Sequence, residues 1–216
     1  MIINETVPQR IANDIIRQMK KRALQNGERL REETYVKMYG VSQTVVRESF
    51  FILESKDLVH RIPRKGTYLS LPQKEEMPKI MKIREINEVF INREFALTRT
   101  SSDLAIIEDI LINAEKELER RDYVRYYDYG QLFHSKVYSL IGYNKLRKLY
   151  ESIQDTIDIY YVNTPNEAEF YEDNLREAHD HRALYSAFVQ KDPDKAEEIT
   201  RIHLNNVINR LERYGT

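Results

Sequence analysis

The sequence predicts a mainly α-helical protein with an N-terminal winged helix-turn-helix domain followed by an all-helical bundle domain. Residues 40–70 read as a helix end, a tight turn, a second helix and a basic two-stranded hairpin. From about residue 76 onward, apolar positions recur only at helical spacing. We therefore expect domains at 1–72 and 76–216, separated near Pro72, which disfavours helix at the residue before it.

Composition limits the class of protein. The chain has 216 residues, enough for two domains, and its 32% charged and 41% hydrophobic residues are typical of globular proteins. Without a run of 18 apolar residues or a recognisable signal peptide, we expect no membrane span and a cytoplasmic location. The absence of cysteine excludes disulfides, thiolate metal sites and cysteine nucleophiles.

Charge is divided unevenly along the chain. The overall net charge is −1, but residues 1–72 carry 13 Lys and Arg against 8 Asp and Glu, a net of +5. The remaining residues carry 21 against 27, a net of −6. The basic part can therefore meet phosphates while the acidic part stays away from nucleic acid.

The N-terminal elements follow from periodicity and capping residues. Helical spacing predicts helices at 7–25, 31–39 and 43–56, with Asn26-Gly27 ending the first and Gly40 the second. Ser42 is a good N-cap for the third helix. Strands at 58–60 and 67–71, joined through residues 63–66, form the wing.

Helices of the second domain are separated by polar, glycine or proline breaks. The last of them has Asp192 as N-cap and Pro193 at its first position. The predicted helices run at 76–99, 102–121, 123–141, 144–162, 166–190 and 193–213.

The helix that begins after Ser42 is predicted to read DNA, because the second helix of this motif places its first residues in the major groove. Arg47 can donate two bonds to guanine, and Gln43 can pair with adenine or with a phosphate. Hydroxyls suit phosphates, and valine can touch a thymine methyl. The expected contacts are Ser42, Gln43, Thr44, Val45 and Arg47.

The wing adds a second predicted contact with DNA. Arg64 and Lys65 lie beside Gly66, where the missing side chain permits close approach to the minor groove or the backbone. The alternative interpretation is that Arg47 and Arg64 are ordinary solvated surface charges.

These patterns resemble the GntR family of bacterial transcription regulators, in the branch with an FCD (FadR C-terminal) ligand-binding domain. In the N-terminal part the matching residues are Gly27-Glu28-Arg29-Leu30, Glu32, Gly40-Val41-Ser42, Thr44, Val46-Arg47-Glu48-Ser49 and Pro63-Arg64-Lys65-Gly66-Thr67. In the C-terminal part they are Arg84, Glu88, Phe133-His134, Asn144, His181-Arg182-Ala183-Leu184, Asp192, Ala196 and His203-Leu204.

The resemblance implies a homodimer that binds a short palindrome of double-stranded DNA, with a helical effector domain that modulates operator affinity. It also implies a divalent metal held by one Asp and three His, with a small organic acid beside it. The chain departs from the family pattern at Glu33 and Gln43, where the family usually has Arg, and at Val45, where it has Pro. We therefore expect the operator contacts to differ from the family norm.

The metal histidines of the family match His134, His181 and His203, and neutral imidazoles suit zinc or nickel. The family's Asp position, one turn before the first histidine, is Gly130 here. Either three His hold the ion with water or a ligand oxygen, or the ion is lost and a larger ligand fills the gap. We expect Gly130 to weaken the site and an Asp there to strengthen it. Alternatively, the histidines are structural.

Candidate effector contacts surround these histidines. Tyr127 and Tyr138 share the helix face of His134 and can line a pocket. Arg84 can pair with the carboxylate of a small metabolite, or else with Glu88 one turn away.

Three function classes remain open. The leading one is a ligand-responsive transcription regulator, which we expect to be a repressor. A three-His metalloenzyme is the second, but no base beside the site and no H-E-x-x-H motif is found. An architectural DNA-binding protein without an effector is the third, and the pocket chemistry on three helices argues against it.

Overall fold

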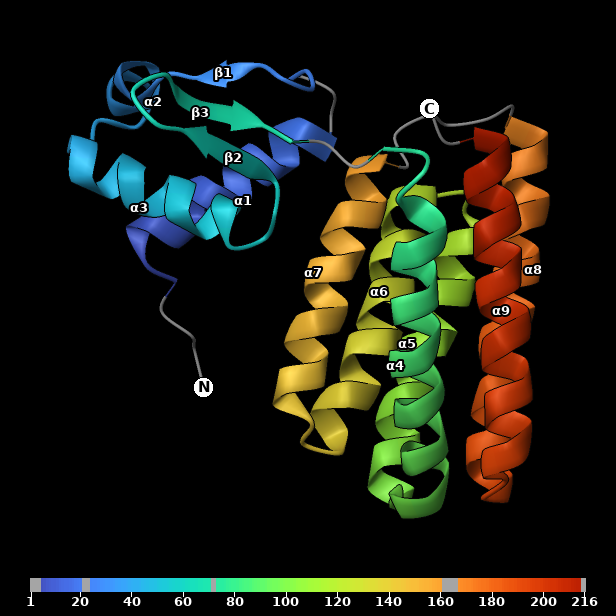
Figure 1. Cartoon of the computed structure of the whole chain (residues 1–216). Helices are drawn as coiled ribbons and strands as arrows, with labels where there is room; N and C mark the ends of the chain where they lie inside the picture. The colour runs from blue at the N-terminus through green and yellow to red at the C-terminus, as the bar shows by residue number, and fades with distance from the viewer. Residues whose placement is uncertain (1–4, 21–23, 71–72, 161–166, 215–216) are drawn as a thin grey trace. The chain divides into compact units, whose positions relative to one another are not determined.

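The computed structural model describes residues 5–20, 24–70, 73–160 and 167–214 (Figure 1). These residues form two compact units. One comprises the chain up to Met77 together with residues 154–160, and the other comprises the remaining described residues. The first unit contains a helix-turn-helix with a small sheet and the second is all helical, which confirms the predicted fold class.

Three helices build the first unit: α1 (Val7–Lys20), α2 (Glu32–Tyr39) and α3 (Gln43–Glu54). Gly40 adopts the left-handed conformation (φ 63°) and donates its N–H to Val36, which ends α2. The Ser42 hydroxyl accepts a hydrogen bond from the Val45 N–H at 3.4 Å, so the predicted N-cap of α3 is confirmed.

The first helix is shorter than predicted. Residues 21–23 lie outside the described residues, and Leu24 and Gln25 are not helical, so the expected extension to residue 25 is wrong. The cause is a competing hydrogen-bond partner. Gly27 donates its N–H to the Leu69 carbonyl, and Leu69 donates to the Glu28 carbonyl, each within 3.0 Å. The segment after α1 therefore pairs with the wing.

The wing is an antiparallel sheet of β1 (Arg29–Leu30), β2 (Val59–Ile62) and β3 (Gly66–Leu69), in the order β1-β3-β2. Both hairpin strands are shifted by one or two residues from their predicted bounds. Strand β1 was not predicted, because two residues are too short to show alternation. The tight turn between β2 and β3 places Arg64 in the left-handed region (φ 64°), with the Lys65 N–H bonded to the Ile62 carbonyl at 3.0 Å.

The helix-turn-helix is held by an apolar core beneath α3. Val46, Phe50 and Leu53 are fully buried there, and Tyr35 of α2 meets Phe50 edge to face at 5.5 Å between ring centroids. The exposed side of α3 is thereby fixed in orientation. Other buried residues of this core are Ile11, Ala12, Ile15, Ile16, Met19, Leu30, Leu58, Val59 and Leu69.

The helical unit follows the predicted pattern closely. Asp192 accepts a hydrogen bond from the Lys195 N–H at 2.9 Å, and Thr100 forms a capping box with Asp103. The predicted break at 164–165 lies outside the described residues. The helices are α4 (Met77–Thr98), α5 (Ser101–Glu119), α6 (Tyr123–Leu140), α7 (Asn144–Tyr160), α8 (Glu167–Gln190) and α9 (Pro193–Tyr214).

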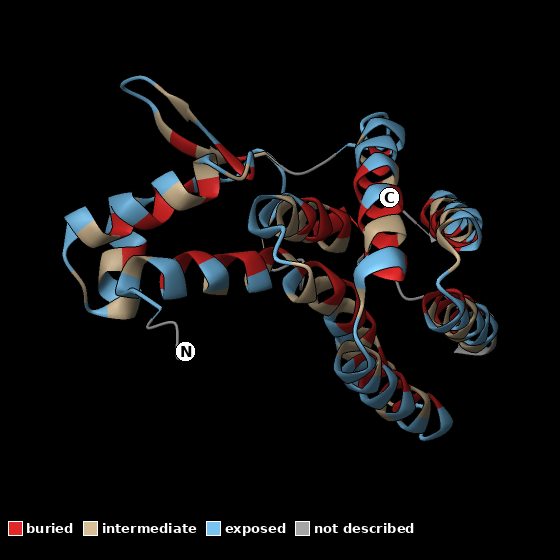
Figure 2. Cartoon of the chain, turned by 90° about the horizontal axis from the view of Figure 1, so that it is seen from below, coloured by how far each residue is buried: buried red, intermediate tan, exposed pale blue. Residues whose placement is uncertain are grey.

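Buried residues, red in Figure 2, lie on the helix faces that turn toward the other helices of this unit. Phe95, Phe133 and Phe188 are fully buried, and the rings of Phe95 and Phe188 meet edge to face at 4.8 Å. This apolar core surrounds a smaller set of buried polar side chains, described below. Among the described residues, no helix is long and apolar enough to cross a membrane.

Candidate functional site

The N-terminus of α3 presents the predicted DNA-reading residues to solvent. Ser42, Gln43, Thr44 and Arg47 are exposed, whereas Val45 is half-buried and packs partly on the core. Since these residues occupy the first turns of the helix, they are the part of a helix-turn-helix that reaches base edges.

Glu32 at the start of α2 anchors two of these residues. Its carboxylate accepts bonds from Arg47 Nε at 2.9 and 3.1 Å and from Gln43 Nε2 at 2.6 Å. Burial raises the pKa of Glu32, but the bonds from Arg47 and Gln43 outweigh it and lower that pKa. The ion pair between Arg47 and Glu32 uses only Nε of the arginine. A bidentate bond to guanine would use the two terminal nitrogens, which Glu32 does not bind. The sequence showed Glu32 only as a motif residue and gave no sign of this role.

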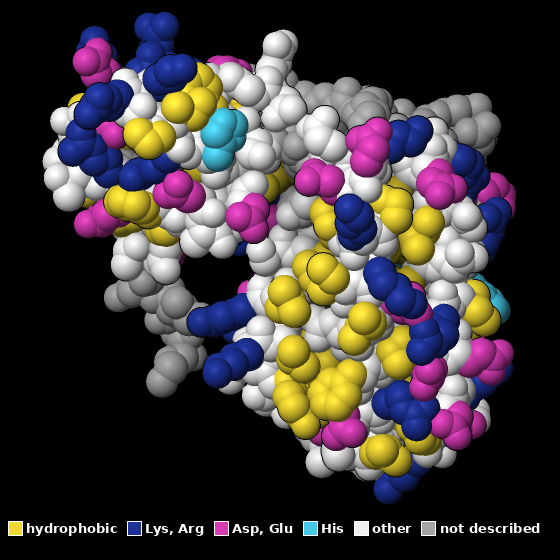
Figure 3. All heavy atoms as spheres, viewed as in Figure 1, with side chains coloured by type: hydrophobic (Ala, Val, Ile, Leu, Met, Phe, Trp, Pro, Cys, Tyr) yellow, Lys and Arg dark blue, Asp and Glu magenta, His cyan; other side chains and the backbone are white. Residues whose placement is uncertain are grey.

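The wing places Arg64 and Lys65 at its exposed tip. Gly66 follows with φ +126°, and a Cβ there would lie only 2.8 Å from Arg29 Nε. Gly66 therefore gives room to Arg29, an exposed cation on β1 that we did not predict as a contact. The motif Gly27-Glu28-Arg29-Leu30 was the feature of the sequence that could have pointed to Arg29. Figure 3 shows Lys and Arg side chains gathered on this unit.

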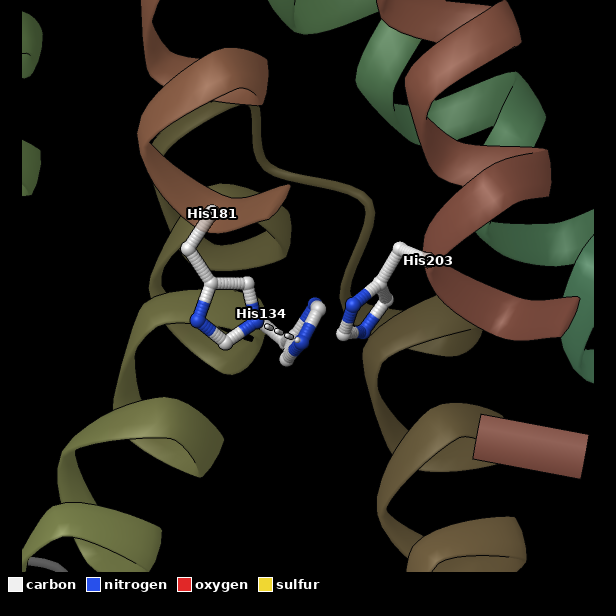
Figure 4. Close-up of side chains that lie close together, drawn as sticks. All are labelled: His134, His181 and His203. Atoms are coloured by element: carbon white, nitrogen blue, oxygen red, sulfur yellow. Dashed lines mark hydrogen bonds between the residues drawn. The ribbon is translucent and has the colours of Figure 1, made fainter. Parts of the chain in front are cut away.

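In the helical unit, His134 of α6, His181 of α8 and His203 of α9 meet at one point (Figure 4). One ring nitrogen of each lies within 4.8 Å of the other two. The Nε2 atoms of His134 and His181 are 3.1 Å apart. All three side chains are buried, so the structure brings together the histidines selected from the sequence.

A buried carboxylate orients His134. Glu88 Oε2 lies 3.1 Å from His134 Nδ1, and the other oxygen of Glu88 accepts a hydrogen bond from Arg84 Nε. Burial raises the pKa of Glu88, but the charges of Arg84 and His134 hold it well below its usual range. An ionised carboxylate at Nδ1 favours a proton there and leaves Nε2 as a lone-pair donor at the centre.

The imidazoles are suited to bind a cation. Burial lowers the pKa of His134, and burial together with the neighbouring His203 lowers that of His181 well below its usual value. Both rings are therefore neutral near pH 7, the form that binds metals. Neither ring nitrogen of His203 has a hydrogen-bond partner among the described residues. Unsatisfied buried nitrogens are costly, which fits a centre built for a ligand.

The position one turn before His134 is Gly130, buried on α6 as the spacing predicted. A Cβ built there would meet Glu177 Oε1 at 3.6 Å and His181 Cε1 at 3.7 Å. Glu177 of α8 also accepts a bond from Arg210 Nη1 at 2.7 Å. We did not predict Glu177 from the sequence, although it lies one helical turn before His181 and thus on the same face.

The three predicted effector residues are linked to the buried pair of Arg84 and Glu88. Arg84 is buried and bound to Glu88, the alternative partner considered for it. Tyr138 is buried, stacks on Tyr150 at 5.1 Å, and its hydroxyl has no hydrogen-bond partner among the described residues. Tyr127 is half-buried, and its phenol interacts electrostatically with Arg84.

Comparisons with known proteins identify both units. Residues 7–69 match the model of the gntR family of bacterial regulatory proteins, and residues 79–206 match the FCD domain. The chain belongs to the GntR family with an FCD domain. It is a DNA-binding transcription regulator and not an enzyme.

Individual relatives are distant but cover most of the chain. The HTH-type transcriptional regulator LutR of Bacillus subtilis is 24% identical over 219 residues, covering 91% of this chain and 97% of that protein. The Uxu operon regulator of Haemophilus influenzae is 27% identical over 186 residues, covering 78% and 68%. The solved structure of E. coli McbR/YncC is 21% identical with a TM-score of 0.76, covering 96% and 98%.

The buried histidines predict acid sensitivity. Folding lowers the pKa of His134 and His181, so below about pH 6.5 the unfolded chain binds protons that the folded chain does not. Their contribution to stability is therefore complete above that pH and is lost as the pH falls toward their folded pKa values. The expected loss is at most about 1.4 kcal/mol per pH unit for each ring.

Urea unfolding in chelator at about pH 7.5 and 5.5 measures this effect, since that range lies above the usual carboxyl pKa values. His181→Gln should reduce the loss. His179→Gln, which changes an exposed histidine of the same helix, should leave it unchanged. Equal losses in all three proteins would contradict the assignment.

Proposed function

We propose that this regulator is a repressor that binds a palindromic operator as a homodimer and responds to a small carboxylate metabolite. The observation that supports it is the combination of an exposed recognition helix in one unit with a buried, polar, cation-binding centre in the other. An architectural DNA-binding protein needs no such centre, and a metalloenzyme needs no recognition helix. A regulator of bacterial genes acts in the cytoplasm, where the chromosome lies.

In this proposal α3 reads the major groove. Arg47 bonds guanine through its terminal nitrogens while Glu32 holds its Nε. Gln43, held by the same carboxylate, contacts adenine or phosphate, and Ser42 and Thr44 contact phosphates. Half-buried Val45 is left with at most a methyl contact to thymine. The wing residues Arg64, Lys65 and Gly66 approach the minor groove or backbone, with Arg29 beside them.

An apolar stripe on α4 supports dimer formation. Ile83, Ile86, Phe90 and Leu97 are 43–65% exposed and recur at helical spacing on one side of this helix. Figure 3 shows hydrophobic side chains gathered on the face of the helical unit that carries α4. A palindromic site requires two copies related by a twofold axis, and such a stripe can pair with itself. We therefore assign the homodimer contact to α4.

The three histidines are proposed to hold a divalent ion, zinc or nickel. Three neutral nitrogen donors within 4.8 Å of one another fit such an ion. The ion supplies the positive charge that attracts the carboxylate of an effector. Tyr127 and Tyr138 line the effector's place, and Arg84 contributes its charge from its pair with Glu88.

The DNA contacts can be tested on operator fragments selected from genomic DNA. Arg47→Ala should cost about 1–3 kcal/mol of binding and relax base preference, because it removes a bidentate contact. Lys65→Ala should weaken binding to all sequences and reduce the salt slope by about 1, because it removes a phosphate contact. Gel shifts over a salt series measure both changes.

Arg120→Ala, an exposed arginine of the helical unit, is the matched control and should bind like wild type. A purified protein that prefers no genomic fragment over random DNA would contradict the proposal that this chain binds a specific operator.

The dimer contact is tested by Ile86→Glu, which places a charge in the most exposed position of the α4 stripe. Burying that charge is costly, so analytical ultracentrifugation should detect monomers, and operator affinity should fall with them. Val124→Glu, at an exposed residue of α6, should remain dimeric. A dimeric Ile86→Glu protein would place the contact elsewhere.

The effector is sought by thermal shift with small organic acids and a divalent metal, followed by gel shift. The coupling should be about 1–3 kcal/mol and reciprocal, so operator DNA must change effector affinity by the same factor. Tyr138→Phe keeps the ring on Tyr150 and removes only the hydroxyl, so it should weaken the effector by about 1 kcal/mol. An acid that stabilises the protein yet leaves operator affinity unchanged is not the effector.

A further inference from the structure

We propose that Glu177 supplies to the histidine centre the carboxylate that position 130 lacks. This inference rests on the proposed metal site and adds a residue to it. In effect, the acidic ligand has moved from α6 to α8, where its side chain lies beside Gly130.

The space beside Gly130 is filled by Glu177. A single point, the Cβ position of residue 130, has Glu177 Oε1 at 3.6 Å and His181 Cε1 at 3.7 Å. The carboxylate oxygen and a metal-facing imidazole therefore border the same small volume. A Cβ there would make ordinary van der Waals contacts, so a side chain larger than alanine at residue 130 would compete with Glu177 for that volume.

Arg210 of α9 orients this carboxylate. Its Nη1 binds Glu177 Oε2 at 2.7 Å, and both side chains are about nine-tenths buried. The oxygen on the Gly130 side, Oε1, is the one available to a cation. Residues that do not bind the ion commonly orient a metal ligand in this way: they hold one oxygen of a carboxylate so that the other oxygen faces the site.

The charge balance at the centre also favours an acidic ligand. Imidazole ligands carry no negative charge, and Glu88 acts only through Nδ1 of His134, whereas one carboxylate bound directly to a divalent ion halves its charge. Burial raises the pKa of Glu177, but Arg210 and the nearby histidines lower it to about 2, so the group is ionised at neutral pH.

A movement of the Glu177 side chain is needed to complete the site. The group of ligand atoms within 4.8 Å of one another contains only the histidines, so Oε1 must move toward them when the ion binds. Glu177, His203 and Arg210 line one hollow between α8 and α9. The carboxylate and His203 therefore border the same hollow.

The expectation that an aspartate at position 130 strengthens the site changes accordingly. In the wild-type background, Gly130→Asp brings a second carboxylate against Glu177, and two like charges in one buried space disfavour each other. Only when Glu177 is replaced by a neutral side chain should the introduced aspartate become useful. The two positions are thus predicted to be non-additive.

The experiment measures Zn²⁺ and Ni²⁺ affinity of the full chain by competition with a chromophoric chelator. Glu177→Gln should lose about tenfold or more in affinity. Gly130→Asp alone should bring no gain. The double variant Gly130→Asp/Glu177→Gln should regain most of the loss. Glu172→Gln, an exposed acid of the same helix, is the matched control and should bind like wild type.

Each alternative result has a defined meaning. If Glu177→Gln binds like wild type while His203→Ala loses the ion, the metal site stands and the role of Glu177 is overturned. If Gly130→Asp alone raises affinity, or the double variant is not rescued, the exchange of positions is overturned. The measurement on Gly130→Asp alone needs no substitution of Glu177, so it decides the matter even if Glu177→Gln does not fold. If wild type binds neither ion, the metal site itself fails and this inference with it.

Discussion

The buried charge of Glu88 is the constraint on which the helical unit depends. A carboxylate in an apolar bundle is tolerated only when it is paired, and Arg84 and His134 approach its two oxygens. Removing Arg84 would leave an unpaired buried charge, and removing Glu88 would leave both a buried guanidinium and an unoriented imidazole. The pair therefore has to be kept together, and its geometry in turn sets the direction of the His134 lone pair. The same contacts therefore stabilise the bundle and orient the imidazole of His134 toward the histidine centre.

A carboxylate also organises its neighbours on the surface proposed to contact DNA. There, Glu32 binds Arg47 and Gln43 rather than an imidazole. Because Glu32 is on α2 and its two partners are on α3, the carboxylate ties the two helices of the motif together at their exposed ends. It also gives two flexible side chains a defined position, which would lower the entropy lost in the proposed binding of DNA. An acidic residue on this surface would thus contribute through the side chains that it holds.

Most of the fold could be predicted because its signals are local. Asp192, Gly40 and the helical spacing after residue 76 each specify a boundary from adjacent residues alone. The early end of α1 and strand β1 could not be predicted, because both depend on residues far along the chain: Gly27 and Glu28 bond to Leu69, and β1 pairs with Thr67 and Tyr68. The histidines were found only through a family resemblance, whereas the position of Glu177 required knowing how α6 and α8 pack. Sequence reasoning was therefore reliable within elements and weak between them.

The three histidines also constrain the order in which the protein can mature. His134 and His181 are 47 residues apart, and His203 lies on α9, the helix that follows α8. During synthesis on the ribosome, the set of three imidazoles is therefore incomplete until α9 has been made. A partly made bundle can offer one or two imidazoles, which hold an ion far more weakly than three. Under the proposed metal binding, ion capture would therefore select chains that contain α9, and a truncated product lacking α9 would bind the ion poorly.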